Sequence, residues 1–395
     1  MLSKIIGGVL LIVGTSIGAG MLALPVASST MGFWPSSCLL TFCWLIMTMG
    51  ALYMTEVSLY VDKGKHLISM AAATLGSKGI VVAWISYVLL LYTLLSAYIS
   101  GGADVFGSIL AAINVKLSDK MAISLFTLIF GLIVYQGIRP VDFVNRILMF
   151  GKLGIYVFLV TLMIPNISFT NFTPKIWNLQ SSLVLIFITS FGFAIIVPNL
   201  RDYFDRDILV LKKVIYIGAL IPFICYVIWD AVIMGLIPLN GRNGLAVLQT
   251  SDHATSQLAL FLSQHINSPF VDRLFNAFTS ICMLTAFLGV ALSLISFLGD
   301  GFKLEQKGGS GLLLFTLTFM PPWLIVMFYP GAYLHALSYA GSCCIVLLLM
   351  LPAWMSLKGR TIYKAGWRAP CGKYLQIFLI ILSLLLLIKS IIYIF

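Results

Sequence analysis

Long uncharged stretches, separated by short charged ones, set the pattern of the chain. After Lys4, no charged side chain occurs until Glu56. A membrane-spanning helix needs about 20 apolar residues, so this stretch is too long for one span and fits two. A second uncharged stretch, residues 308–357, fits two spans in the same way. The pattern predicts an all-α membrane protein that crosses the bilayer many times.

Charged residues and turn residues together predict 11 transmembrane helices. Turns at Gly32–Pro35 and Tyr329–Gly331 divide the two longest uncharged stretches. The spans are expected at 5–29, 36–59, 79–103, 121–138, 147–164, 181–200, 214–237 and 274–299, twice within 308–357, and at 374–394. The longest polar segment, residues 240–269, is expected to hold a short surface helix.

The first span contains a glycine-rich interruption, GTSIGAG at residues 14–20. Each glycine costs a helix roughly 1 kcal/mol relative to alanine. A backbone break inside a bilayer leaves polar groups unpaired, at several kcal/mol each, unless something polar fills it. Gly14 and Gly18 also fit the spacing of a close-packing helix face. The first span by itself leaves both interpretations open.

The sixth span repeats this interruption. TSFG at residues 189–192 has the order of TSIG at residues 15–18, and Pro25 and Pro198 follow the two motifs. Paired interruptions in corresponding segments of two halves indicate a transporter binding site. Each break opens a set of five spans, and because five is odd the second set enters the membrane inverted.

We therefore predict a single transporter domain over residues 1–395 with a 5+5 inverted repeat plus one extra helix. The first repeat covers about 5–165, the second, inverted repeat covers about 181–353, and the eleventh helix covers about 374–394.

Composition agrees with this interpretation. The chain is 61% hydrophobic and 9% charged, whereas soluble domains carry about 25% charged residues. Its net charge of +11 indicates orientation rather than nucleic-acid binding, since 18 of the 24 Lys and Arg residues fall on the side of the N-terminus. The seven cysteines form no CxxC pair and the four histidines show no ligand spacing, so no metal or other cofactor is predicted.

Five stretches carry a family resemblance: GTSIGAGMLALP at residues 14–25, AYISGGAD at 97–104, TSFGF at 189–193, FLGVAL at 287–292 and the run from 319 to 341. In order and spacing they resemble the hydroxy/aromatic amino acid permease family of bacteria, in the APC superfamily, and within it the tyrosine permeases. The resemblance implies a LeuT-type fold, an inner-membrane location and proton-driven uptake of tyrosine. Tryptophan, or a broader set of aromatic and neutral amino acids, is the alternative substrate.

The resemblance also implies which backbone groups at the breaks bind the two charged groups of an amino acid. A half-helix N-terminus suits the carboxylate, and unwound carbonyls suit the ammonium. The glycines are expected to adopt positive φ, which other residues avoid. Tyr92 in the third span and two phenylalanines at the second break are the main aromatic candidates. Tyr98, nearer the outer end of the third span, is a further one, and Phe287 and Tyr339 are weaker. The predicted substrate site comprises Thr15, Ile17, Gly18, Ala19, Gly20, Tyr92, Thr189, Ser190, Phe191, Gly192 and Phe193.

Four acidic residues lie at or near membrane depth. Asp104 and Asp300 fall at span ends, which indicates an interfacial position, whereas Asp230 is deeper and departs from the resembling permeases. Glu56 lies in the family-like run TEV at the inner end of the second span. It is the proton-coupling candidate, and a loop-paired carboxylate is the alternative. Thr285-Ala286 in the eighth span falls where sodium-coupled relatives of the resembling fold often carry a pair of hydroxyls, and the single hydroxyl at this position favours protons over sodium.

Two other classes of membrane protein fit less well. An intramembrane enzyme needs a cluster of acid, base or nucleophile at membrane depth, and a channel needs a repeated filter motif or charged rings. Neither pattern occurs in the sequence, so we predict no enzymatic activity. The expected partners are an amino acid, protons and membrane lipids, with no nucleic acid and no obligate protein partner.

The charge bias gives the first testable prediction. The N-terminus should lie in the cytoplasm and the C-terminus in the periplasm, because basic connections are retained inside. A C-terminal alkaline phosphatase fusion should be active and a C-terminal green fluorescent protein fusion dark. The opposite pattern would show that one span is miscounted.

Overall fold

The computed structural model describes residues 2–62, 66–172, 181–205, 207–241, 243–266, 268–304, 308–329, 331–363 and 367–394. Every regular element in these residues is a helix. Nine of the described helices are long and apolar enough to cross a membrane, and a bent pair makes a tenth span. A multi-pass, all-helical fold is thereby confirmed. The number of 11 spans and the inverted repeat stay predictions.

The first half of the chain forms six helices: α1 (Leu2–Ser16), α2 (Ala19–Ser28), α3 (Phe33–Ser58), α4 (Leu67–Ala112), α5 (Asp119–Tyr135) and α6 (Ile138–Met163). Short 3₁₀ turns η1 (Ile164–Asn166) and η2 (Phe169–Phe172) follow. The turn predicted near Gly32 is present, with φ of 83° at that glycine. Helix α4 extends well beyond the predicted third span and is kinked at Gly76, whose φ of 69° favours glycine.

The second half begins with α7 (Ser181–Ser190), η3 (Gly192–Ile196), α8 (Val197–Tyr203) and α9 (Ile208–Leu236). The polar segment then holds two helices where one was expected, α10 (Leu245–Gln249) and α11 (Ala254–Ile266). The chain continues with α12 (Pro269–Phe302), α13 (Gly308–Phe328), α14 (Tyr333–Cys344), the π-helical η4 (Ile345–Met350), α15 (Leu351–Ile362) and α16 (Gly372–Ile394).

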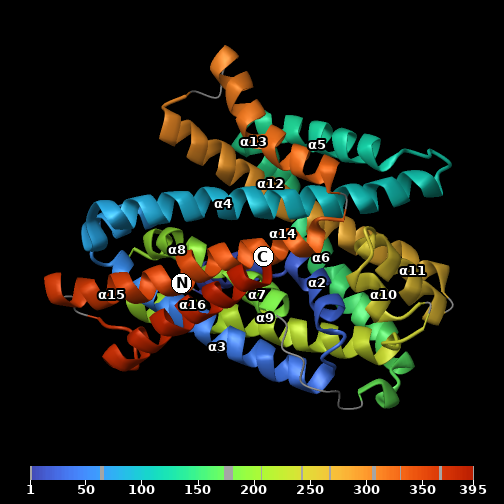
Figure 1. Ribbon diagram of the computed structural model, residues 1–395, viewed down its shortest axis with the longest axis horizontal. Helices are drawn as coiled ribbons and strands as arrows, with labels where there is room; N and C mark the ends of the chain where they lie inside the picture. Colours follow the sequence, from blue (N-terminus) through green and yellow to red (C-terminus); the bar gives the residue numbers. More distant parts are fainter. Residues whose placement is uncertain are drawn as a thin grey trace.

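Helix α4 runs along the length of the molecule (Figure 1), with α5 and α13 on one side and α3, α9 and α16 on the other. It packs against α12 and α14, while α14 packs against α7 and α1 against α9. The short helices α10 and α11 lie together at the right-hand end of the view. This packing brings the two interrupted spans to the middle of the molecule.

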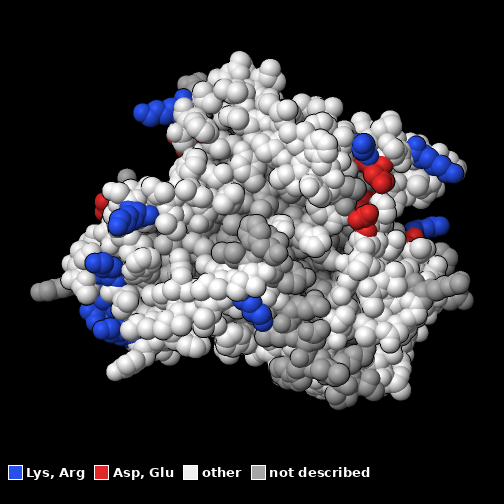
Figure 2. All heavy atoms as spheres, in the orientation of Figure 1, with Lys and Arg blue, Asp and Glu red and all other residues white. Residues whose placement is uncertain are grey.

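Basic side chains gather at the left-hand end of the face in Figure 2, where Figure 1 places α15. Carboxylates on this face gather near the right-hand end of α4. One residue in the charge count is misplaced: Lys152 lies inside α6 and is 1% exposed, so it belongs to no connection. Of the residues used in predicting topology, Lys63, Lys65, Lys175, Arg206, Arg242, Lys307, Pro330 and Lys364 lie outside the described residues.

Candidate functional site

The first span is broken where the glycine-rich motif predicts. Helix α1 ends at Ser16, α2 begins at Ala19, and the two are bent by 49°. The first N–H groups of a helix have no partner within the helix, so the start of α2 presents free donors. The expectation of positive φ is wrong for Gly18, whose φ of −158° is open to any residue.

Glycine is needed at this break for space. A Cβ at Gly18 would meet only the Cβ of Ala286, at 3.9 Å. A Cβ at Gly20 would lie 2.9 Å from Ser190 Oγ and 3.4 Å from Ser190 Cα. The first break therefore packs directly on Ser190, the last residue of α7, where the second break begins.

Three side chains from distant helices pair the unwound carbonyls of the first break. Lys152 Nζ of α6 donates to the Ile17 carbonyl at 2.5 Å. The Tyr333 hydroxyl of α14 donates to the Ala19 carbonyl. The Tyr226 hydroxyl of α9 lies 2.5 Å from the Ser16 carbonyl and 2.9 Å from the Ser190 carbonyl.

None of these three donors was predicted, and all three are buried. An unpaired buried carbonyl costs about 1–3 kcal/mol, so the donors stabilise the unwound backbone. A sequence signal existed for Lys152 alone, which stands six residues inside a predicted span. The two tyrosines carry no local signal that separates them from the other 14 in the chain.

A cavity of about 380 Å³ lies against both breaks. Helix α4 lines it with a stripe at three- and four-residue spacing, and α12 contributes a facing stripe of small side chains. The α4 stripe comprises Tyr87, Leu90, Leu91, Leu94 and Tyr98, and the α12 stripe comprises Thr285, Ala286, Gly289, Val290 and Ser293. Leu11 of α1 and Asn199 of α8 also line the cavity.

The structure brings most of the predicted substrate residues to this cavity. Thr15, Gly18, Ala19, Gly20, Thr189, Ser190 and Gly192 line it. Ile17, Phe191 and Phe193 are fully buried and do not appear in its lining. Tyr92 lies off the α4 stripe, and its hydroxyl donates to the Leu317 carbonyl of α13 at 2.7 Å. Tyr98 lines the cavity from the same helix, because the two tyrosines lie on different faces of α4.

Glu56 lies in a closed ion-pair network away from the cavity. Arg360 Nε and Nη2 donate to its two carboxylate oxygens, each at 2.7 Å. The Tyr60 hydroxyl and the Ala369 N–H donate to the same oxygens at 2.7 and 2.8 Å. This network ties α3 to α15, which supports the structural alternative, and the coupling role of Glu56 stays a prediction. The Asp230 carboxylate, by contrast, is 1% exposed and has no hydrogen-bond partner among the described residues.

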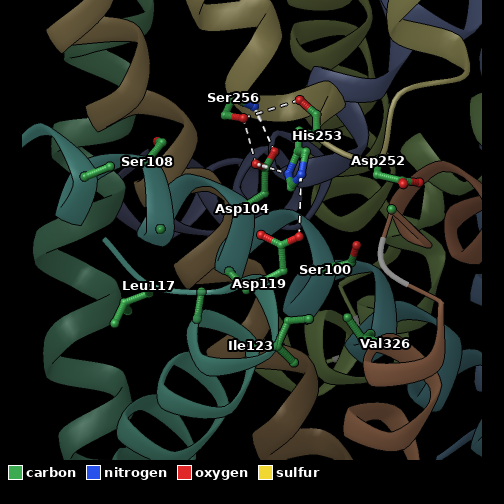
Figure 3. Close-up of a pocket in the computed structure, with 15 residues that line it drawn as sticks. Ser100, Asp104, Ser108, Leu117, Asp119, Ile123, Asp252, His253, Ser256 and Val326 are labelled. Carbon is green, nitrogen blue, oxygen red and sulfur yellow. Dashed lines mark hydrogen bonds and ion pairs between the residues drawn. The ribbon is translucent and has the colours of Figure 1, made fainter. Parts of the chain in front are cut away.

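Asp104 is more than an interfacial carboxylate, because it binds the N-terminus of α11 (Figure 3). Its oxygens accept from the Ser256 N–H at 2.9 Å, from Ser256 Oγ at 2.6 Å and from the Thr255 hydroxyl at 2.7 Å. A carboxylate at a helix N-terminus pairs free N–H groups and favours the helix dipole. His253 Nδ1 lies 3.2 Å from Asp104 Oδ1, and His253 Nε2 lies 3.7 Å from Asp119 Oδ2.

A second tie holds the same segment to the first span. Gln249 Nε2 of α10 donates to the Val26 and Ala27 carbonyls near the end of α2, at 3.0 and 3.1 Å. The α10–α11 segment thus bridges α2 and α4. Neither α10 nor α11 contributes a residue to the lining of the cavity.

A model of the tryptophan/tyrosine permease family matches residues 1–390. The chain belongs to this family. The permease is 33% identical over 363 residues to the tyrosine-specific transport system 2 of Haemophilus influenzae, covering 91% of this chain and 88% of the relative. It is 28% identical over 364 residues to a tryptophan-specific transport protein of Pseudomonas aeruginosa, covering 90% and 87%.

The fold of the permease is similar to that of a solved structure of another protein. That protein is a nucleobase-cation-symport-1 family transporter with bromovinylhydantoin bound. The two folds match with a TM-score of 0.63 at 12% sequence identity, over 98% of this chain and 89% of the other. The likeness assigns a LeuT-like fold. The relatives are transport proteins and permeases, so the chain is a transporter and not an enzyme. Among the described residues, no group of three or more His, Cys, Asp or Glu is placed to hold a metal ion.

The His253 contacts predict a pH dependence. The hydrogen bond to the Asp104 carboxylate raises the pKa of His253, and Asp119 and Asp252 add to this effect. A raised pKa in the folded state means a stabilisation that is complete below the ordinary value of about 6.5 and lost as pH rises through the raised value. The melting temperature of the purified protein should therefore decrease as the pH is raised from about 6 to about 8.

The histidine variants isolate this effect. His253→Gln should flatten the slope, whereas His265→Gln, at the other end of α11, should keep it. An unchanged slope in His253→Gln would assign the pH dependence to other groups.

Proposed function

We propose that this permease imports an aromatic amino acid, tyrosine foremost, together with protons across the bacterial inner membrane. The observation that carries the proposal is the meeting of helix ends of opposite polarity, from the two breaks, at one cavity. The start of α2 offers N–H groups of Ala19 and Gly20 to a carboxylate. The ends of α1 and α7 offer the carbonyls of Ser16 and Ser190 to an ammonium. This pair of poles suits the zwitterion of an amino acid.

The composition of the cavity walls favours a substrate with an aromatic side chain. The leucines of α4 face the small residues of α12 across the cavity. A Cβ placed on Gly289 would meet no heavy atom within 4 Å, so this wall leaves a gap. A flat ring fits between two apolar walls, and such walls form most of a small-molecule site. The tyrosine-specific relative supports tyrosine, and the tryptophan-specific relative keeps tryptophan as the alternative.

Lys152 supports proton coupling. Its amine is buried at the first break and donates to the Ile17 carbonyl, on the helix segment that frames the cavity. A buried charge without an acidic partner costs several kcal/mol, so proton binding at this amine depends on how the break is closed and hydrated. We propose Lys152 as the coupling residue in preference to Glu56, whose oxygens are already occupied by four donors.

Counterflow in proteoliposomes tests transport directly. Vesicles loaded with unlabelled tyrosine should accumulate labelled tyrosine, because a carrier exchanges its substrate without a driving force. Vesicles loaded instead with tryptophan, phenylalanine or glutamine give the order of substrate preference, from the amount of labelled tyrosine that each internal amino acid lets accumulate. A lack of exchange with every aromatic amino acid would reject the proposal.

The glycines at the first break give separate expectations. Gly18→Ala should keep a near-normal melting temperature, because the new methyl group enters free space, yet it should lose the stabilisation by tyrosine that grows as RT ln(1 + [L]/Kd). Gly20→Ala should lower stability by about 1–3 kcal/mol as well, since its Cβ collides with Ser190. Thermal shift with and without tyrosine measures both. A full tyrosine response in Gly18→Ala would place the substrate elsewhere.

A pair of variants separates the two coupling candidates. Lys152→Gln removes the titratable amine but keeps an N–H donor, so exchange should persist while accumulation driven by a proton gradient is lost. Glu56→Gln should lower thermal stability, because it breaks a buried ion pair with Arg360, and leave accumulation per folded molecule intact. The reverse pattern would assign coupling to Glu56.

A further inference from the structure

Tyr226 joins the two breaks through one atom. Among the hydrogen bonds of the described residues, its hydroxyl is the group that contacts both, at 2.5 Å from the Ser16 carbonyl and 2.9 Å from the Ser190 carbonyl. Lys152 and Tyr333 each serve one carbonyl of the first break. Ser16 and Ser190 are the last residues of α1 and α7, so two helix ends with partial negative charge meet at this hydroxyl.

The tyrosine is held firmly in this place. Its side chain is 0% exposed, and its ring lies 5.3 Å from the ring of Phe191. Helix α9 also approaches α1 closely, since a Cβ on Gly218 would meet Ile12 side-chain carbons at 2.8 Å. Tyr226 lies behind the cavity, whereas Ser16 and Ser190 line it.

The two carbonyls together lack a donor. A phenol hydroxyl has one proton and donates it to one acceptor at a time. The serine side chains do not make up the difference, because Ser190 Oγ donates to the Ile186 carbonyl and Ser16 Oγ is buried with no hydrogen-bond partner among the described residues. Within this part of the chain, one of the two facing carbonyls therefore receives no proton, at a position next to the cavity.

We propose that Tyr226 is a positioning residue that sets the affinity for the ammonium group of the substrate. It holds the ends of α1 and α7 at a fixed separation, and the ammonium supplies the donor that the pair of carbonyls lacks. The inference rests on the proposed function, because it requires an amino acid at the breaks. It adds a residue outside the cavity that acts on one end of the substrate.

The test compares Tyr226→Phe with a matched control. Tyr156→Phe removes the hydroxyl of another buried tyrosine, which lies on α6 and donates to the Cys225 carbonyl of α9 at 3.0 Å instead of to a carbonyl of either break. Dissociation constants are measured for L-tyrosine, N-methyl-L-tyrosine, altered at the ammonium, and L-tyrosinamide, altered at the carboxylate. Melting temperatures without ligand report folding.

Tyr226→Phe should weaken tyrosine binding about tenfold, the upper range for one buried hydrogen bond, whereas Tyr156→Phe should change it little. The penalty for N-methylation should be smaller in Tyr226→Phe than in the unmutated protein, because the ammonium end is no longer held in register. The penalty for the amide should stay the same in both proteins.

Other outcomes overturn the inference. Equal weakening for all three ligands would make Tyr226 merely structural, and unchanged binding would remove it from the site. If Tyr226→Phe does not reach the membrane, Tyr226→His, which keeps a ring and a donor, replaces it and is judged by the same comparison of ligands. Failure of the unmutated protein to bind any aromatic amino acid would reject the proposed function instead.

Discussion

The pairing of backbone carbonyls inside the membrane is the constraint on which this structure depends. The hydrocarbon region supplies no water to an unwound segment, so the backbone of a break must be paired by other parts of the protein or line a cavity. Lys152, Tyr226 and Tyr333 supply those donors from α6, α9 and α14. The helices that surround the first break are therefore fixed to it by their polar side chains as well as by packing.

This arrangement also explains the polarity of the cavity. The protein satisfies the carbonyls of Ile17 and Ala19 with one donor each, while Ser16 and Ser190 share a single proton. The N–H groups at the start of α2 stay open. Under the proposed function, a zwitterion adds what each side lacks, so the feature that makes the break costly in the empty protein would also select an amino acid.

Two polar networks lie at opposite ends of the molecule from each other. The Glu56–Arg360 pair fastens α3 to α15, and Asp104 fastens the start of α11 to α4. In both networks a partly buried carboxylate accepts several hydrogen bonds. Such a network favours a stable contact between two helices over a mobile one. The cavity is lined by the C-terminal half of α1 and by no residue of α10 or α11.

The sequence by itself determined the features that depend on local composition. Runs of uncharged residues specify the spans because the bilayer excludes charge, and glycine-rich motifs specify where α1 and α7 stop because glycine weakens a helix. Only the tertiary structure decided which side chains complete the site. Tyr98 lines the cavity and Tyr92 does not, because the rotation of α4 is set by its packing. Glu56 finds Arg360, 304 positions away, and Tyr226 finds both breaks, because such pairings arise from the approach of whole helices and leave no mark in the local sequence.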